Sequence, residues 1–126
     1  MQDTAAPIHS LSDKERDLVE RARRFRREVV APEAARWERE RQQPLEAIRA
    51  AAKLGFTAIE VPAEHGGQGA RFIAKALIAE ELARSCMSFA FSLINTQNVA
   101  SRVALQGTQA QIARHLAPLV AGERLG

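Results

Sequence analysis

Residues 87–106, MSFAFSLINTQNVASRVALQ, are the stretch that decides the fold of this chain. Their large apolar side chains are expected on every side of a helix axis, and Arg102 is their only charged residue. A helix that is apolar all round is normally buried at the centre of a fold. The stretch therefore predicts a central helix whose buried-type positions are Phe89, Phe91, Leu93, Ile94, Val99, Val103 and Leu105.

The apolar content of this helix has two interpretations. One is core packing, which is the commoner use of such side chains. The other is that one face lines a groove for an apolar ligand or a partner domain, because the helix is more apolar than a small bundle of charged helices needs. The second interpretation requires an apolar face that is open to the surface.

The segments on either side of residues 87–106 are also predicted to be helices. Gly107 ends the central helix, and Thr108 with Gln111 forms the reciprocal capping pair that begins a final helix. The buried residues of that final helix are expected to be Ile112, Leu116 and Leu119. A helix over residues 71–85 is predicted to precede the central one, with inward side chains Phe72, Ala76, Leu77 and Ala83.

The first helix is predicted to begin near Asp13, because Ser12 and Glu15 form a capping box. Pro32 is expected to end it or bend it sharply. Its apolar stripe consists of Leu18, Ala22, Phe25 and Val29.

Two short helices are expected next. One covers residues 33–41, with Trp37 as its only large apolar anchor, and Pro44 begins the other, over residues 44–54. Gly55 is predicted to end this helix in the left-handed conformation. Its buried side is expected to be Leu45, Ile48 and Ala52.

A loop is predicted between these helices and residue 71. Residues 57–62, TAIEVP, are too short for a helix and favour an extended connector. The glycines of HGGQG, residues 65–69, match neither a dinucleotide-binding fingerprint nor a P-loop. A tight turn that needs positive φ is therefore favoured over a phosphate cradle.

Length and composition indicate one small helical domain. The chain has 126 residues, of which 46% are hydrophobic, which is enough for one core but not for a second domain. Helix formers dominate and Tyr is absent. We expect an all-α bundle of about five to six helices over residues 11–126, preceded by a flexible lead-in over residues 1–10.

The sequence predicts a cytoplasmic location. Residues 1–10 lack the basic and apolar regions of a secretory signal, and no stretch reaches the roughly 20 apolar residues that span a bilayer. The single cysteine, Cys86, cannot form an internal disulfide, which favours a reducing compartment.

No complete catalytic or metal site is expected within the chain. Glu80 and Glu81 are neighbours on a helix, so their side chains point about 100° apart and cannot act on one substrate atom. The three histidines have no metal-ligand spacing, and Cys86 has no activating neighbour in sequence. The histidines are His9, His65 and His115.

An arginine-rich stretch is the best sequence argument for nucleic acid. Acidic residues lie three or four positions from these arginines, so ordinary helix-surface ion pairs are favoured, and no aromatic stacking residues are interleaved. A nucleic-acid partner is therefore not expected. The arginines are Arg21, Arg23, Arg24, Arg26 and Arg27, and the acids are Asp17, Glu20 and Glu28.

Three motifs occur in order along the chain: VPAEHGGQG at 61–69, EELAR at 80–84 followed by Ser88, and GTQAQIARHLAPLVAGE at 107–123. Together they resemble the N-terminal helical domain of the acyl-CoA dehydrogenase family, whose patterns are V-P-E-x-[YF]-G-G-x-G, E-E-L-A-R-x-x-x-S and G-T-x-x-Q-x-x-x-[YW]-L-P-x-L-x-x-G-E. The sequence departs from these patterns at Ala63, at His65 and His115, where an aromatic is common, and at Pro118, which comes one residue late.

The resemblance implies an FAD flavoprotein that oxidises an acyl-CoA thioester between its α and β carbons. In that family a glutamate removes the α proton, flavin N5 accepts the β hydride, and an electron-transfer flavoprotein usually takes the electrons. The flavin lies between a middle β domain and a C-terminal helical domain, and the base usually comes from the latter. The resemblance thus implies that this chain holds no catalytic and no FAD-binding residues, is inactive alone, and precedes both domains.

The resemblance also implies a role in substrate binding for the helix that matches Phe89 to Asn98. Its carried-over positions in the acyl-chain pocket are Ala90, Phe91, Ile94 and Asn98. The bulk of Phe91 and Ile94 favours a short or shaped cavity. The expected partners are acyl-CoA, an electron-transfer flavoprotein and further copies of the protein. A free-standing helical module that binds a protein partner is the alternative function.

Overall fold

The computed structural model describes residues 10–126, and almost all of the predicted lead-in, together with His9, lies outside them. No strand forms within that range, so the predicted all-α fold is confirmed. The α-helices are α2 (Asp13–Phe25), α3 (Ala31–Glu40), α4 (Leu45–Lys53), α5 (Phe72–Ala83), α6 (Met87–Gln106) and α7 (Gln109–Val120), with a π-helical turn at Arg26–Val30 and a 3-10 turn at Ala63–His65.

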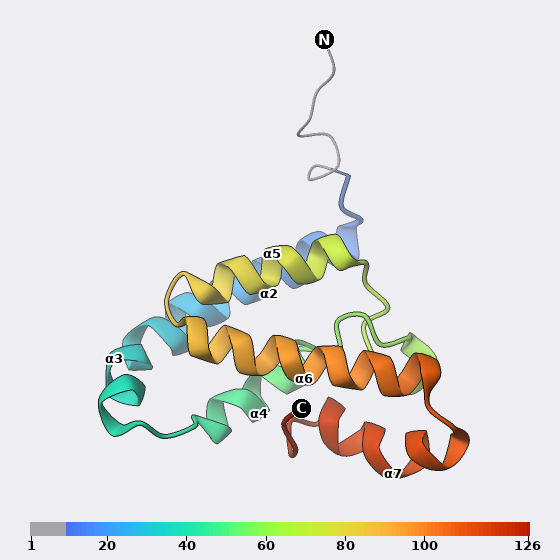
Figure 1. Cartoon of the computed structure of the whole chain (residues 1–126). Coiled ribbons are helices and arrows are strands. Elements are labelled where there is room, and N and C mark those ends of the chain that lie inside the picture. The colour runs from blue at the N-terminus through green and yellow to red at the C-terminus, as the bar shows by residue number, and fades with distance from the viewer. Residues whose placement is uncertain (1–9) are drawn as a thin grey trace.

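Helix α6 lies at the centre of the bundle, as predicted. It packs against α5 on one side and α7 on the other, and α2 packs behind α5 (Figure 1). The ring of Phe89 stacks on Trp37 of α3 at 5.3 Å and on Phe25 of α2 at 6.0 Å between centroids. The main core is formed by Leu18, Ala22, Phe25, Val30, Ile48, Ala51, Phe56, Ile59, Ile78, Leu82, Phe89, Ala90 and Leu93.

The predicted helix ends are confirmed where local hydrogen bonds define them. Ser12 and Thr108 each accept a hydrogen bond from the backbone three residues later, and both capping boxes are complete. Gly55 follows α4 with a φ of 94°, in the left-handed region that glycine adopts without a steric penalty.

The helical run does not end at Pro32, so that part of the prediction is wrong, although the regular α-helix α2 stops at Phe25. The backbone continues from α2 through the π-helical turn into α3, which begins at Ala31. Pro32 lies in the first turn of α3, directly after the π-helical turn, whose last backbone bond is donated by Ala31 to the Arg26 carbonyl.

Several predicted burial faces are also wrong. On α5, Phe72 is 66% exposed and Ala76 is exposed, whereas Ala74, Ile78 and Leu82 are buried. Helix α5 is apolar on most of its circumference, so periodicity alone did not distinguish the inner side. Leu45 on α4 is exposed because it lies at the end of its helix, beside the loop from α3.

The connector at residues 57–62 runs through the interior. The Thr57 hydroxyl donates to the carbonyl of Val120 at 2.6 Å, and the Glu60 N–H donates to Oε1 of Gln97 at 2.7 Å. These two bonds tie the connector to the end of α7 and to the middle of α6. The predicted absence of a helix here is confirmed, but the predicted extended connector is wrong: residues 57–61 form turns and bends, and most of them are buried.

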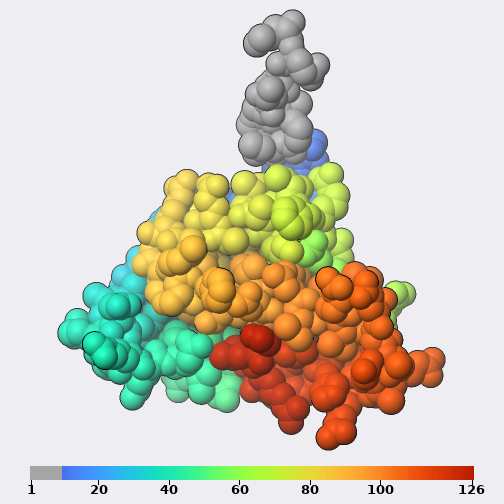
Figure 2. All heavy atoms as spheres, viewed as in Figure 1, coloured from blue at the N-terminus to red at the C-terminus, as the bar shows by residue number. Residues whose placement is uncertain are grey.

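The last residues of the chain lie against α6. The N–H of Gly126 donates to Oγ1 of Thr96 at 3.1 Å, and a side chain at Gly126 would meet Val99. Figure 2 shows this segment as the dark red patch against the orange surface of α6. One flank of α6 is thus covered by residues that come after α7.

Candidate functional site

The outer face of α6 is the candidate functional surface. Residues advance by about 100° along a helix, so Met87, Phe91, Ile94, Asn98 and Leu105 lie on one side of it. Met87, Phe91 and Leu105 are well exposed, at 69%, 62% and 64%. The prediction that α6 is buried all round is therefore wrong on this side, and an apolar face is open, as the groove interpretation requires.

A groove of about 790 Å³ lies beside the first half of this face. Its walls come from α3 and from the start of α6, and Phe91 is its largest apolar side chain. Most of the lining is apolar or small: Ala34, Ala35, Glu38, Gln43, Ser85, Cys86, Met87, Ser88, Phe91 and Ser92. An aromatic ring on the wall of an open groove is a suitable contact for a hydrocarbon chain.

The four predicted pocket residues have different environments. Phe91 lines the groove, and Ile94 is partly buried on the same face. Asn98 is exposed further along that face. Ala90 lies at the edge of the face, buried within the main core, where its small side chain leaves space for its neighbours.

A polar cluster that sequence reasoning missed lies next to Asn98. Lys75 on α5 donates to Oδ1 of Asn98 at 3.0 Å and pairs with the Glu60 carboxylate at 2.6 Å. The fully buried Gln97 donates to both Glu60 (3.2 Å) and Asn98 (3.1 Å). Three segments distant in sequence meet here, so no local pattern could have predicted the cluster.

A second groove, of about 420 Å³, opens beside this cluster. Unlike the first, its lining is mostly polar: Glu60, Lys75, Asn98, Ser101, Arg102, Leu105 and Gln106. Lys75 also lies over the ring of Phe72, with its ammonium 4.5 Å from the ring centroid. The outer face of α6 therefore passes from an apolar groove to a polar one.

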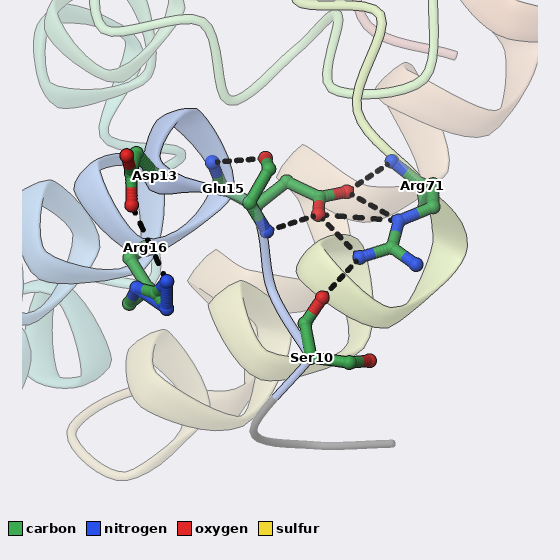
Figure 3. Close-up of polar contacts among 6 residues, drawn as sticks. Ser10, Asp13, Glu15, Arg16 and Arg71 are labelled. Carbon is green, nitrogen blue, oxygen red and sulfur yellow. Dashed lines mark hydrogen bonds and ion pairs between the residues drawn. The ribbon is translucent and has the colours of Figure 1, made fainter. Parts of the chain in front are cut away.

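The capping residue Glu15 has a second role in the tertiary structure. Its buried carboxylate accepts hydrogen bonds from the backbone N–H of Arg71 at 2.9 Å and from the Arg71 guanidinium at 2.6 Å, and that guanidinium also donates to the Ser10 carbonyl (Figure 3). Hydrogen bonding from Arg71 lowers the pKa of Glu15 to about 2, against the opposing effect of burial. This pair joins the start of α2 to the start of α5.

The neighbouring acids Glu80 and Glu81 do not form a catalytic pair. Glu81 is buried and faces Arg23 at 3.2 Å and Arg26 at 3.5 Å, whereas Glu80 is exposed and pairs with Arg84. Their side chains point to different surroundings, as the helical spacing predicts. Glu81 therefore anchors α5 to α2 and to the π-helical turn.

The arginine-rich stretch is largely engaged with acids. Arg21 pairs with Asp17 at 2.5 Å, and Arg23 pairs with both Glu20 and Glu81, which raises the pKa of the Arg23 guanidinium. These are the predicted helix-surface pairs, with the contact to Glu81 in addition. Arg24 and Arg27 are exposed, and Arg26 faces Glu81 at 3.5 Å.

The glycine-rich turn uses its backbone amides internally. The N–H groups of Gly66, Gly67 and Gly69 donate to the carbonyls of Ala63, Pro62 and Val61, respectively. A side chain at Gly67 would lie 2.0 Å from the carbonyl oxygen of Val61. The loop thus serves close backbone packing, and its occupied amides do not fit a flavin phosphate.

Neither a cluster of metal-ligating side chains nor a membrane-spanning helix occurs within residues 10–126. No group of three or more potential metal-ligating side chains occurs in the described part, and His65 and His115 lie on separate elements. No described helix is long and apolar enough to cross a membrane.

The fold and the motifs are those of a known domain. The chain matches the family model for the acyl-CoA dehydrogenase N-terminal domain over residues 12–123, and it therefore belongs to that family. Among curated relatives, a probable acyl-CoA dehydrogenase of Bacillus subtilis (strain 168), YngJ, is 32% identical over 115 residues. The aligned region covers 90% of this chain and 30% of that protein.

Solved structures agree with this assignment. Butyryl-CoA dehydrogenase from Megasphaera elsdenii is similar with a TM-score of 0.82 and 29% identity, over 93% of this chain and 32% of that one. An acyl-CoA dehydrogenase complexed with FAD from Bacillus anthracis has a TM-score of 0.73 and 25% identity, over 93% and 20% of the two chains. The chain thus spans a third or less of the length of these relatives.

Proposed function

We propose that this chain is the N-terminal domain of an FAD-dependent acyl-CoA dehydrogenase that performs α,β-dehydrogenation of acyl-CoA thioesters. The domain, residues 11–126, contributes part of the acyl-chain pocket and is inactive alone. The middle β domain and the C-terminal helical domain of the complete enzyme supply the glutamate base and hold FAD. The occupied amides of the glycine turn are consistent with a flavin bound elsewhere.

The open outer face of α6 is the observation that carries the proposal. Exposed apolar side chains on a central helix do not stabilise the core of the domain. A group of them on one face is instead typical of a binding surface. Phe91 and Ile94 supply an apolar surface for an acyl tail, Asn98 lies further along it, and Ala90 sets the spacing behind it.

The remaining exposed apolar side chains support further contacts in the complete protein. Leu45, Phe72 and Leu105 are exposed on three different helices and suit contacts with other domains or with further copies in a homo-oligomer. An electron-transfer flavoprotein is the proposed electron acceptor. The lone Cys86, which is not in a disulfide, fits the reducing environment of the cytoplasm.

The test is an assay of the complete gene product against straight-chain acyl-CoA thioesters of increasing length, with an artificial electron acceptor. We expect FAD to copurify and at least one thioester to be oxidised. A gene product that ends after this domain and binds a protein partner without FAD would contradict the proposal and favour the helical interaction module.

The role of the outer face is tested with Phe91→Ala in the complete enzyme. Removing the ring enlarges the cavity, so the preferred acyl chain is expected to become longer, with a change of about tenfold in the ratio of kcat/KM between long and short thioesters. Phe91→Leu, which keeps most of the apolar bulk at the same position, is the matched control and should shift the preference less. If the chain-length profile of Phe91→Ala is unchanged, Phe91 does not line the acyl-chain pocket.

A further inference from the structure

A third groove, of about 490 Å³, lies between α3 and α4. These consecutive helices do not pack closely against each other, and the loop that joins them lies at the end of the bundle opposite the turn from α6 to α7 (Figure 1). Of its described lining, only Gln43 also belongs to the groove beside Phe91. This α3–α4 groove is therefore a surface separate from the one assigned to the acyl chain.

The inner walls of the α3–α4 groove are largely apolar. The ring of Trp37 lines the groove from α3 and is held in place by stacking on Phe89, with 5.3 Å between centroids. From α4 come the half-exposed Leu45 and the small side chains of Ala47 and Ala50. An apolar side chain of a partner can therefore contact Trp37 and Leu45 without rearrangement of the core.

The rim of the α3–α4 groove is acidic. Glu33 and Glu40 on α3 and Glu46 on α4 line it, and Arg36 is the one cation of its described lining. Three carboxylates against one guanidinium leave two excess negative charges, although the whole chain has a net charge of +3. This surface therefore favours a partner with positive charges.

Carboxylates are available on both sides of the groove. Arg36 lies 2.9 Å from an oxygen of Glu33 and of Glu40, so one guanidinium is shared by two negative charges. The exposed side chain of Glu46 makes no ion pair within residues 10–126. Glu33 and Glu40 are two helical turns apart, about 10 Å along α3. Basic residues on either side of an apolar anchor can therefore reach acids on both rims.

We propose that the α3–α4 groove docks a basic amphipathic helix of a partner protein, with an apolar side chain against Trp37 and Leu45 and cations against the acidic rim. A groove with apolar walls is the usual receptor for such a helix. Pairing of the groove with its own copy is disfavoured, because a two-fold axis would place carboxylates against carboxylates. An electron acceptor has to approach the flavin, so a groove separate from the acyl-chain surface suits a different partner. The inference thus goes beyond the proposed function.

The experiment measures the binding of two fluorescent peptides to the complete gene product by anisotropy. One is a helical peptide of about four turns, with leucines at every third or fourth residue and lysines beside them, and the other has glutamates in place of the lysines. The lysine peptide is expected to bind with a Kd about tenfold lower than that of the glutamate peptide. This difference should shrink as the salt concentration is raised.

Charge reversal at Glu46 tests whether the peptides bind in this groove. Glu46→Lys is expected to raise the Kd of the lysine peptide about tenfold and to lower that of the glutamate peptide, because the charge of one rim changes sign. Leu45→Ala should weaken both peptides to a similar extent, about fivefold, because it removes apolar contact area. Glu64→Lys reverses an exposed acid outside the groove that is also unpaired within residues 10–126. It is the matched control and should change both Kd values by less than about twofold.

The outcomes distinguish the partner helix from other occupants. Absence of binding, equal affinity of the wild type for both peptides, or an equal response of Glu46→Lys and Glu64→Lys would overturn the proposal. Self-association of the complete protein that Glu46→Lys abolishes in sedimentation would make a second copy the occupant and overturn it as well. Displacement of the lysine peptide by an electron-transfer flavoprotein would do the same in favour of the electron acceptor. Glu46→Lys should oxidise thioesters at the wild-type rate, so a failure of the proposed function shows in that assay and not in peptide binding.

Discussion

Phe89 and Phe91 are two residues apart on α6 and have opposite environments. Phe89 is 1% exposed and stacks on rings from α2 and α3, whereas Phe91 is 62% exposed beside a groove. Two positions on a helix differ by about 200°, so one ring points into the bundle and the other away from it. The same side chain thus stabilises the fold at one position and is available for binding at the other.

The largest expected effect on this comparison comes from Phe89→Ala. The substitution removes a buried ring and leaves a cavity between three helices, so the free energy of unfolding should fall by about 3–5 kcal/mol. Phe91→Ala should lower it by less than about 1 kcal/mol, because that ring is already largely hydrated. Urea denaturation of both variants checks the prediction, and equal losses would show that the two faces are not distinct.

A smaller effect is expected for the polar residues of the same helix. Gln97→Met keeps the size of a fully buried side chain but leaves the Glu60 N–H without its acceptor, which should cost about 1–3 kcal/mol. Asn98→Ala, on the outer face, should cost less. The denaturation midpoints of the two variants test this prediction. A larger loss of stability in Asn98→Ala than in Gln97→Met would contradict it.

Acid should weaken a buried ion pair more than an exposed one. The folded-state pKa of Glu15 is about 2, below its ordinary value of 4.5, so its stabilising effect is complete above about pH 4.5 and is lost as the pH falls towards 2. After allowance for screening at the exposed guanidinium of Arg71, the loss should be about 1–2 kcal/mol. The difference in stability between wild type and Glu15→Gln, measured from pH 6 to pH 2, should therefore shrink in that window. A constant difference would contradict the assignment.

The smallest effect is expected at the exposed ion pairs of Arg36 on α3. Contacts with Glu33 and Glu40 raise the pKa of its guanidinium and lower that of Glu33, but all three side chains are solvated. Arg36→Gln should leave the thermal midpoint close to that of the wild type, because exposed pairs contribute little. A marked drop in the melting temperature would show that α3 depends on these pairs.

Sequence reasoning succeeded where structure depends on near neighbours. The bounds of α6 agree with the predicted stretch, and the capping boxes at Ser12 and Thr108 mark the starts of α2 and α7. Each of these features depends on hydrogen bonds between residues three or four positions apart. The motifs at 61–69, 80–84 and 107–123 also indicated the family that the match over residues 12–123 shows.

Sequence reasoning failed where the direction of a side chain depends on distant elements. Periodicity predicts Phe72 inside, but it is exposed, and Glu81 is buried opposite Arg23 of α2 and Arg26 of the π-helical turn. Both residues lie on α5, which is apolar on most of its circumference, so periodicity could not tell which side meets the core.

The sequence by itself determined the all-helical fold, the capped helix ends and the family, because capping, turn chemistry and motif order depend on short stretches of chain. Only the tertiary structure decided which side of α6 is open and that Glu60, Lys75 and Gln97 surround Asn98. The physical reason is that burial and ion pairing depend on which segments meet in space, and the three segments of this cluster lie 15 to 38 positions apart in the chain.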